Sequence, residues 1–315
     1  MFSGGNYIES AFECVDEDSL KIHLQNFEVT ESVKSLFKDK PCRATEFSAG
    51  YDLGVIDDVV IPARTSKFVT FGNVVRVENG FYIGVVVPRS SLAKKRGLIL
   101  ANGPYFIYKG TDSHLLSLKF INFTDEDVEL KAGDKIAQCL FIKFPSWLIS
   151  DTNEMEGELC EEVIISDNPL DEHIMSPMLE DNIETLSGHP VDSISQWVYS
   201  FQAPENVELL PGKVTCVMTG LRCKCNLGQV FILKCALNNS CVELANCIGI
   251  IDADYYDNPD NKGEIGVLLL NRGTQPVKIN SGDVIATGSL YSYGTIVGDS
   301  FGGKRLGGFG STDKN

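Results

Sequence analysis

The amino-acid sequence predicts an all-β protein made of two β-sandwich or β-barrel domains in tandem. Short runs rich in β-branched and aromatic residues alternate with Gly, Pro, Asn and Asp about every ten residues, which is typical of strands joined by turns. Apolar stripes with the period of a helix are hard to find. The strand-and-turn rhythm stops once, in an acidic stretch, and then resumes, so the chain divides into two β units.

The first domain is expected to span residues 1–146. Its early part includes an alternating strand pattern at 19–25, and its last strands are expected at 115–123 and 135–144. Residues 147–195 are expected to form a solvated linker, because Asp and Glu crowd this segment and no Lys or Arg occurs between Lys143 and Lys213. One short helix over 154–165 fits within that linker.

The second domain is expected over residues 196–298, where the strand rhythm resumes. A Gly-rich stretch, 299–315, follows it and is expected to be a flexible carboxyl-terminal arm.

The two units look like copies of each other. IPARTSKFVTFG (61–72) parallels LPGKVTCVMTG (210–220), AGDKIAQ (132–138) parallels SGDVIAT (281–287), and the Leu-Ala-Asn triplets at 100–102 and 244–246 match. Gly84 and Gly228 keep the same spacing to those triplets, and the strand at 120–123 parallels the strand that ends at Asn271. The matches occur in the same order, which indicates a duplicated domain.

Composition limits what the chain can bind and where it works. A net charge of −16 repels polyanions and disfavours binding to DNA or RNA, whereas a small nucleotide can be held by a local cluster of donors. The sequence has no run long enough to span a membrane and no secretory signal, so we expect an intracellular protein, cytoplasmic or nuclear. Its ten scattered cysteines are expected to be reduced and mostly buried. The pair Cys223 and Cys225 is expected to serve packing rather than a metal.

The stretch from 247 to 271 carries the clearest chemistry. It reads as an apolar run, an Asp-x-Asp-Tyr cluster, a polar loop and a second apolar run, which predicts a β-hairpin. Asp252 follows Gly249-Ile250-Ile251, where a strand end would hold a carboxylate rigidly, and Tyr255 comes three residues later.

Five stretches of the chain together resemble the conserved motifs of the homotrimeric all-β dUTP nucleotidohydrolases (dUTPases). SAGYDL (48–53) is similar to the first motif, GVVVPRSSLAKKRG (84–97) to the second, residues 246–271 to the third, AGDKIAQ to the fourth and GGFGSTDKN (307–315) to the fifth. The resemblance implies two dUTPase-like domains of the jelly-roll or distorted β-barrel type. It also implies hydrolysis of dUTP to dUMP and pyrophosphate with Mg²⁺.

The motifs are divided between the two halves. In the family each active site takes motifs one, two and four from one subunit, the third from another and the fifth from a third. Here the first half holds motifs one, two and four, and the second half holds three and five. By the Leu-Ala-Asn register Asp252 corresponds to Tyr108, and Leu233 and Lys234 stand where Arg89 and Ser90 stand. Likewise Thr287 replaces Gln138, and Phe201 falls near the place of Asp52.

This division predicts a monomer with one composite site between its two domains, and a trimer of the chain stays open as an alternative. Duplicated monomeric dUTPases occur in large DNA viruses such as herpesviruses, which adds a virus-infected host cell as a setting. In the mammalian herpesvirus enzymes the third motif lies in the amino-terminal half, whereas here it lies in the carboxyl-terminal half.

The resemblance also implies a role for each site residue. Asp252 would be the general base that activates water at the α-phosphorus, Tyr255 would pack on the deoxyribose, and Asn246 with the backbone at Gly249 would bind uracil. Asp52 would hold magnesium through its waters. The phosphates would be bound by Arg89, Ser90, Ser91 and Gln138. In the arm, Phe309 would stack on uracil, and Gly310, Ser311 and Thr312 would wrap the γ-phosphate.

One basic position of the arm stays open. The family has Arg five residues before the Phe, and this chain has Lys304 there with Arg305 beside it, so either could bind phosphate. Two alternative functions also stay open: a dCTP deaminase-like enzyme, and a catalytically inactive dUTPase-like protein that binds a nucleotide or a protein partner.

Overall fold

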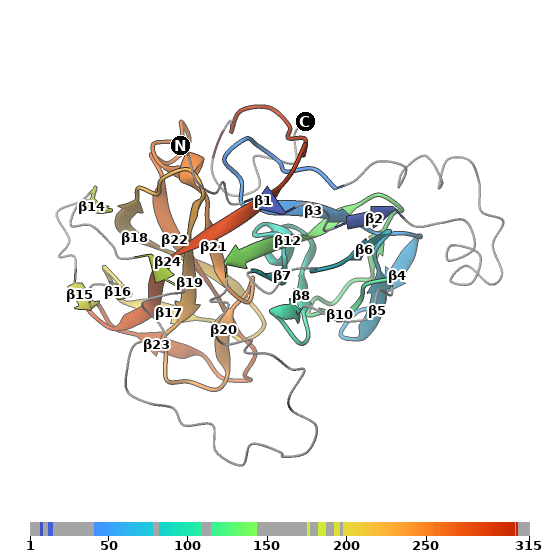
Figure 1. Cartoon of the computed structure of the whole chain (residues 1–315). Helices are drawn as coiled ribbons and strands as arrows, with labels where there is room; N and C mark the ends of the chain where they lie inside the picture. The colour runs from blue at the N-terminus through green and yellow to red at the C-terminus, as the bar shows by residue number, and fades with distance from the viewer. Residues whose placement is uncertain are drawn as a thin grey trace, which may run out of the picture.

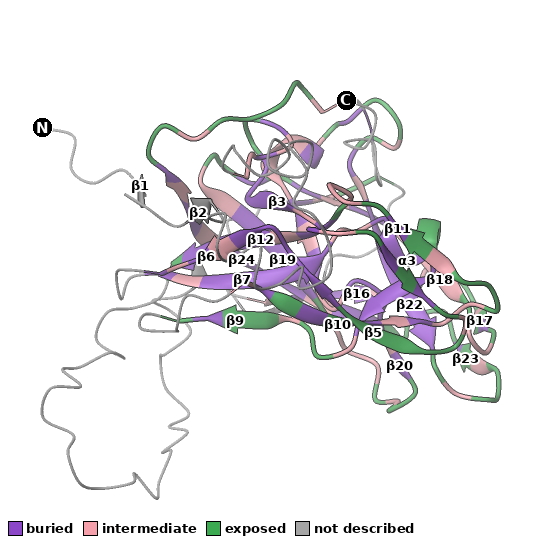
Figure 2. Cartoon of the chain, turned by 90° about the vertical axis from the view of Figure 1, so that its right-hand side faces the viewer, coloured by how far each residue is buried: buried purple, intermediate pink, exposed green. Residues whose placement is uncertain are grey.

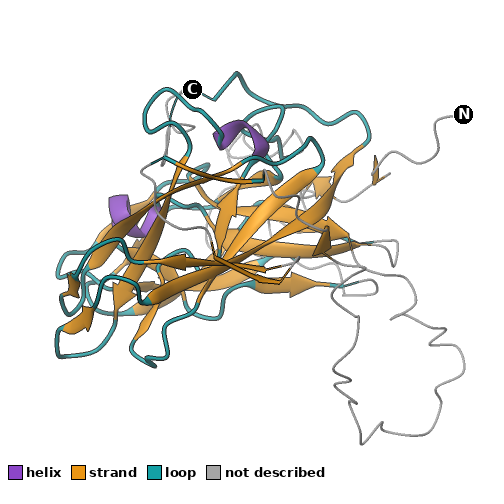
Figure 3. Ribbon diagram, turned by 90° about the vertical axis from the view of Figure 1, so that its left-hand side faces the viewer, coloured by secondary structure: helices purple, strands orange, loops and turns teal. Residues whose placement is uncertain are grey.

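The computed structural model describes residues 7–8, 12–14, 41–77, 82–108, 115–143, 175–176, 182–186, 192–195, 198–305 and 307. In these ranges the chain is all-β, with one short α-helix and one 3₁₀ turn, as the sequence predicts (Figure 3). The expected strand at 19–25, the helix at 154–165 and the arm residues Phe309, Gly310, Ser311 and Thr312 lie outside the described residues. No helix in the described part is long and apolar enough to cross a membrane.

The amino-terminal unit, residues 41–143, folds into short strands around its own core. Its elements, with two strands that precede it, are β1 (Tyr7–Ile8), β2 (Phe12–Cys14), β3 (Gly50–Gly54), β4 (Val59–Ile61), β5 (Ser66–Thr70), β6 (Asn73–Val75), β7 (Tyr82–Pro88), α3 (Leu92–Arg96), β8 (Leu98–Leu100), β9 (Tyr105–Ile107), β10 (Ser117–Asn122), β11 (Val128–Leu130) and β12 (Lys135–Lys143). Its core includes the fully buried side chains of Tyr51, Phe71 and Phe120.

The carboxyl-terminal unit, residues 182–296, repeats this plan around a second core that includes Phe201, Phe231 and Leu269. Its elements, with one strand that precedes it, are β13 (Met175–Ser176), β14 (Ile183–Thr185), β15 (Asp192–Ser195), β16 (Val198–Gln202), β17 (Val207–Leu209), β18 (Val214–Cys223), β19 (Gln229–Cys235), β20 (Val242–Leu244), β21 (Gly249–Ile251), the 3₁₀ turn η2 (Ala253–Tyr255), β22 (Glu264–Asn271), β23 (Val277–Ile279) and β24 (Val284–Ile296). Strands β13, β14 and β15 fall within the predicted linker, 147–195, and pair with β24, β18 and β16.

The two units share one continuous sheet. Strand β12 of the first unit pairs with β24 of the second through Phe141 opposite Gly294 and Ile142 opposite Tyr293, in the middle of the molecule (Figure 1). An apolar cluster joins the units, with Val87 of β7 and Leu140 of β12 from one side and Val230 of β19 from the other. Buried stretches of β7, β12, β19 and β24 accordingly run through the centre of Figure 2. The contact between the units is therefore built like a protein core.

Equivalent polar anchors occur in the two units. Asn122 and Asn271 are both completely buried at the ends of β10 and β22. The amide of Asn122 donates to the carbonyl oxygens of Ile61 (3.0 Å) and Glu126 (2.7 Å). The amide of Asn271 donates to those of Leu209 (2.9 Å) and Gln275 (2.8 Å). Each asparagine oxygen also accepts a backbone N–H two residues later. A turn fixed this way in both halves supports the predicted duplication.

The strand pairing corrects part of the predicted register. Gly84 pairs with Ile107, but the residue that pairs with Ile251, the counterpart of Ile107, is Phe231 and not Gly228. Counting forward from these pairs puts Ala236 and Leu237, rather than Leu233 and Lys234, at the positions of Arg89 and Ser90. The prediction failed because β19 is displaced by three residues relative to a constant offset from the Leu-Ala-Asn triplets. Arg89 and Ser90 still have no counterparts in the second unit, where the corrected register puts the apolar residues Ala236 and Leu237.

Other parts of the register are confirmed. Asp52 pairs with Gln138 in β12, and Ser200, next to the predicted Phe201, pairs with Thr287 in β24. Strands β9 and β21 each end one residue before Tyr108 and Asp252, which puts these two residues at equivalent strand ends.

The cysteines only partly follow the expectation. Eight cysteines have described side chains and all eight are free thiols, as predicted, but only Cys139, Cys223 and Cys225 among them are buried, so the prediction of mostly buried cysteines is wrong for these residues. The sulfurs of Cys223 and Cys225 lie 3.6 Å apart inside the second core, where both side chains pack.

Candidate active site

A pocket lies where the two units meet, and both units line it. The amino-terminal unit contributes Ala44, Ser48, Gly50, Asp52, Arg89, Ser90 and Gln138. The carboxyl-terminal unit and the segment after it contribute Leu233, Asn246, Gly249, Ile250, Ile251, Asp252, Tyr255, Gly266 and Arg305. The structure thus brings together nine residues that the sequence singled out: Asp52, Arg89, Ser90, Gln138, Asn246, Gly249, Asp252, Tyr255 and Arg305.

Two predicted residues lie elsewhere. Ser91 is buried immediately before α3 and is not among the residues that line the pocket. Lys304 is exposed, while its neighbour Arg305 lines the pocket. The residues 309–312 of the arm are outside the described part of the chain.

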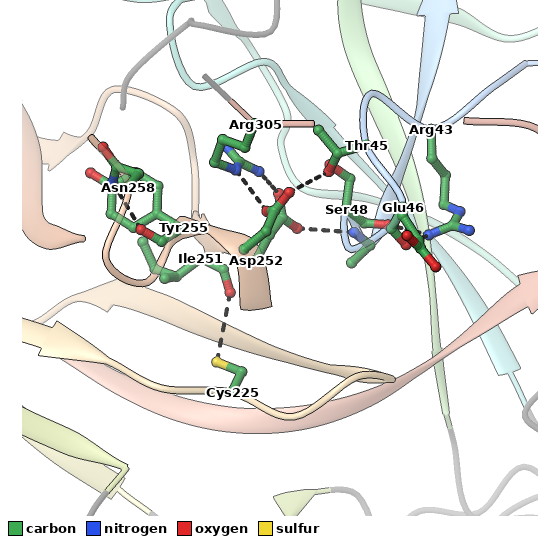
Figure 4. A network of polar contacts seen from close by, with 12 residues as sticks. Arg43, Thr45, Glu46, Ser48, Cys225, Ile251, Asp252, Tyr255, Asn258 and Arg305 are labelled. Carbon is green, nitrogen blue, oxygen red and sulfur yellow. Dashed lines mark hydrogen bonds and ion pairs between the residues drawn. The ribbon is translucent and has the colours of Figure 1, made fainter. Parts of the chain in front are cut away.

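Asp252 stands at the end of β21, where the chain leaves the strand and enters η2. Its Oδ1 accepts the backbone N–H of Ala49 at 2.9 Å, and its Oδ2 lies 2.5 Å from Nη2 of Arg305 (Figure 4). Burial raises the pKa of the Asp252 carboxyl, and this effect outweighs the opposing influence of Arg305 and the Ala49 N–H. A carboxylate with a raised pKa is a stronger base than an exposed one.

A second carboxylate, that of Asp254, lies beside Asp252. It pairs with Nε of Arg305 at 2.7 Å and accepts a hydrogen bond from the hydroxyl of Thr45 at 2.6 Å. The sequence showed the Asp-x-Asp spacing but gave no role to Asp254, Thr45 or Ala49. Thr45 and Ala49 come from the amino-terminal unit, so their contacts with the hairpin depend on the packing of the two units.

Arg305 is the described residue of the arm that enters the site. It spans both carboxylates, and the centre of its guanidinium lies 5.8 Å from the centre of the Tyr255 ring. The structure therefore favours Arg305 over Lys304 at the basic position that the sequence left open.

The path of the arm to the pocket is fixed on the amino-terminal unit. Arg43 pairs with Asp299 at 2.6 Å, and Tyr51 donates its hydroxyl to the same carboxylate at 2.7 Å. The backbone of Arg43 also bonds to Ser300 and Gly302.

Tyr255 is buried in η2 with its ring against the pocket. Its hydroxyl donates to the backbone oxygen of Glu264 (3.0 Å) and accepts the amide of Asn261 (2.8 Å). Burial raises its pKa to about 12, so the phenol is neutral at physiological pH.

The wall from the amino-terminal unit carries Asp52 and Gln138 on paired strands and Arg89 directly after the end of β7. Asp52 in β3 pairs with Gln138 in β12, which in turn pairs with Val87 in β7. Nε of Arg89 lies 3.4 Å from Asp52, and Nζ of Lys135 lies 3.9 Å from it. A Cβ at Gly50 would clash with the side-chain amide of Gln138, so glycine there leaves room for the Gln138 side chain to lie across β3.

Asn246 presents an unsatisfied acceptor at the pocket. The residue is buried, yet its Oδ1 finds no hydrogen-bond partner among the described residues. A buried polar atom without a partner costs free energy, and a ligand or water that donates to it removes that cost. Nearby, Gly249 approaches Leu233 so closely that a Cβ would stand 2.9 Å away.

The carboxylates of the pocket fit a magnesium ion that is held mainly by the phosphates of a bound substrate. Within the described ranges no group of three or more His, Cys, Asp or Glu could cage a metal. Mg²⁺ that bridges substrate phosphates needs only one or two carboxylates and keeps several waters. Asp52, with its carboxylate on the pocket wall, meets that requirement.

Comparison with known proteins gives a consistent result. The family model described as dUTPase matches residues 38–158. The deoxyuridine 5'-triphosphate nucleotidohydrolase of Lactococcus lactis is 34% identical over 119 residues, which cover 36% of this chain and 79% of the relative. The protein of the same name from Paramecium bursaria Chlorella virus 1 is 41% identical over 101 residues, or 32% and 68% of the two chains. The crystal structure of dUTPase from Streptococcus mutans aligns with a TM-score of 0.33 and 24% identity, over 36% of this chain and 95% of that one.

Proposed function

The chain belongs to the dUTPase family, and from this premise we propose that it hydrolyses dUTP to dUMP and pyrophosphate at one site formed by both of its units. The observation that supports a single composite site is the lining of the pocket. Asp52, Arg89 and Gln138 come from the first unit, while Asn246, Asp252 and Tyr255 come from the second. At the equivalent positions the first unit has lost the base, and the second unit has lost the phosphate-binding groups.

In this proposal Asp252 is the general base. Its raised pKa suits it to take a proton from water, and the Ala49 N–H fixes the orientation of the carboxylate through Oδ1. The oxygen that faces Arg305 becomes available when that guanidinium moves to a phosphate. The triphosphate would then compete with Asp252 and Asp254 for Arg305.

The first unit would bind the charged end of the substrate. Arg89 supplies a guanidinium, Ser90 a hydroxyl and Gln138 an amide, which together can hold phosphate oxygens in one orientation. Magnesium would be held by Asp52 through its waters and by the phosphates, and would neutralise charge on them.

The second unit would select the nucleoside. The unpartnered Oδ1 of Asn246 can accept the N–H of uracil, and a site built this way rejects a base that lacks the donor. The ring of Tyr255 would lie against the deoxyribose and leave no space for a 2'-hydroxyl. The arm beyond Arg305 would close over the bound nucleotide, with Phe309 on uracil and 310–312 around the γ-phosphate.

Pyrophosphate release from dUTP, dTTP, dCTP and UTP, with and without Mg²⁺, tests the reaction. We expect turnover with dUTP alone and its loss when a chelator removes the metal. Ammonia release from dCTP without pyrophosphate would instead identify a deaminase. No turnover of dUTP would refute the proposal.

Mixing two inactive variants tests whether the site forms within one chain. A chain with Asp252→Asn and a chain with Arg89→Ala each lack one half of the site. Because we propose a monomer, the mixture should stay inactive and light scattering should give the mass of one chain. Recovered activity in the mixture, or the mass of a trimer, would show that the site forms between chains.

A further inference from the structure

The loop that follows Tyr255 is held from outside by residues far from the pocket. Residues 256–263 form a compact loop in which the amide of Asn258 donates to the Tyr255 carbonyl at 2.8 Å. Gly263 closes the loop with a positive φ of 79°, and a Cβ there would stand 2.8 Å from the backbone N of Asp257. Since Asn261 of this loop also holds the Tyr255 hydroxyl, the placement of the loop sets the placement of the ring.

Arg222 contacts three points of this loop. Its guanidinium lies 4.3 Å from the centre of the Tyr256 ring, 3.3 Å from the Asp257 carboxylate and 3.4 Å from the Lys262 carbonyl oxygen. The register between β18 and β22 shifts between Met218 and Arg222, and this irregularity turns the Arg222 side chain toward the loop.

Glu184 completes this contact from the end of the acidic segment. In β14 it stands directly opposite Arg222, and its Oε2 lies 2.7 Å from Nη2 of Arg222. The same oxygen accepts the hydroxyl of Tyr256 at 2.7 Å. The Tyr256 hydroxyl, with Arg222, holds the pKa of the Glu184 carboxyl below its usual value, so this residue is ionised at neutral pH.

The loop also lies against the start of the arm. A Cβ at Gly307 would meet the carboxylate of Asp260, so the arm passes directly beside the loop at this point. A shift of the loop would therefore disturb two parts of the site at once, the Tyr255 ring and the approach of the arm.

We infer that Glu184 is a positioning residue that sets the selectivity for deoxyribose over ribose. It acts through Arg222 and through Tyr256 of the loop, and the loop in turn holds the Tyr255 hydroxyl through Asn261. This inference rests on the proposed function, because it takes the Tyr255 ring as the surface that meets the sugar. The inference gives a role to a residue of the acidic segment. The end of that segment forms β14, which belongs to a sheet of the second unit, and Glu184 in it helps to fix the hairpin of that unit.

Glu184→Gln is the most direct test, because it removes the charge and keeps the shape of the side chain. We expect the ratio of kcat/KM for dUTP to kcat/KM for UTP to fall about five- to tenfold, as for the loss of a coupled contact. Glu184→Asp should recover part of that ratio. Tyr256→Phe, which removes only the hydroxyl, should lower the ratio as well, and the double variant should lose less than the sum of the two.

Glu243→Gln is the matched control. Glu243 pairs with Arg272 at 3.4 Å on the surface of the same unit and touches neither the loop nor the pocket. It should keep the parental ratio and the parental melting temperature. A parental ratio in Glu184→Gln and Tyr256→Phe would overturn the inference, as would an equal loss with both substrates. Failure of the parent to hydrolyse dUTP would refute the proposed function instead.

Discussion

Replacing Asp252 by Asn removes the proposed base with little change of shape. Asn can still accept the Ala49 N–H through its oxygen, and Arg305 keeps its 2.7 Å pair with Asp254. The pocket should therefore still bind dUTP, with KM close to that of the parent. General-base catalysis contributes about 10²- to 10⁴-fold to a rate, so kcat should fall by that factor.

The fold should tolerate this substitution. Burial raises the pKa of Asp252 above that of an exposed aspartate, so the folded state binds this proton more tightly than the unfolded state does. Ionisation at neutral pH then weakens the fold, and Asn removes that cost while giving up the pair with Arg305. We expect a melting temperature at pH 7 no lower than that of the parent.

Single-turnover pyrophosphate release at saturating dUTP measures the effect on chemistry. Asp254→Asn is the matched control, because it changes the neighbouring carboxylate and leaves Asp252 paired with Ala49 and Arg305. Its rate should fall by about tenfold or less, as for the loss of one charged hydrogen bond. If Asp252→Asn kept a rate within tenfold of the parent, or if Asp254→Asn lost as much, Asp252 would not be the base.

Three further predictions follow from the same contacts. Arg305→Gln should move the acidic limb of the kcat/KM profile, which reports the free enzyme, to higher pH, because Arg305 lowers the pKa of Asp252; an unmoved limb would contradict the pairing. Asn246→Leu should raise KM for dUTP about 10- to 100-fold through loss of the uracil acceptor, while circular dichroism stays parental; an unchanged KM would refute that role. Asn122→Ala and Asn271→Ala should each lower the free energy of unfolding by about 2–4 kcal/mol, because each leaves buried backbone groups without a hydrogen-bond partner. A large effect at only one of the two positions would count against equivalent turns.

Much of the fold could be read from local patterns. The Gly-Asp turns at 133–134 and 282–283, with positive φ at both glycines, are visible in the sequence because a tight turn requires glycine there. The strand ends that carry Tyr108 and Asp252 could be matched because each follows a Leu-Ala-Asn triplet at the same distance. The register of β19 could not be predicted in this way. Phe231 and not Gly228 corresponds to Gly84, and this displacement of three residues is set by pairing with β24 and has no local sequence signal.

The acidic segment is a second case in which the sequence did not predict a tertiary contact. Its composition is typical of a solvated linker, and it predicted nothing about Glu184. Only the pairing of β14 with β18 places that carboxylate opposite Arg222. A single charged residue in an acidic run has no sequence signal that separates it from its neighbours.

The sequence alone predicted the chemistry of the site: which half would carry the base and which would carry the phosphate-binding groups. These follow from residue types at fixed spacings along a strand or turn, and such spacings are local. The tertiary structure decided which partners surround them. Arg305 rather than Lys304 lines the pocket, and it follows a segment that Arg43 and Tyr51 hold through Asp299. Ala49 and Thr45 reach the hairpin because the two units pack through β12 and β24. These contacts join residues some 200 positions apart, as between Ala49 and Asp252, and no local pattern can encode such a distance.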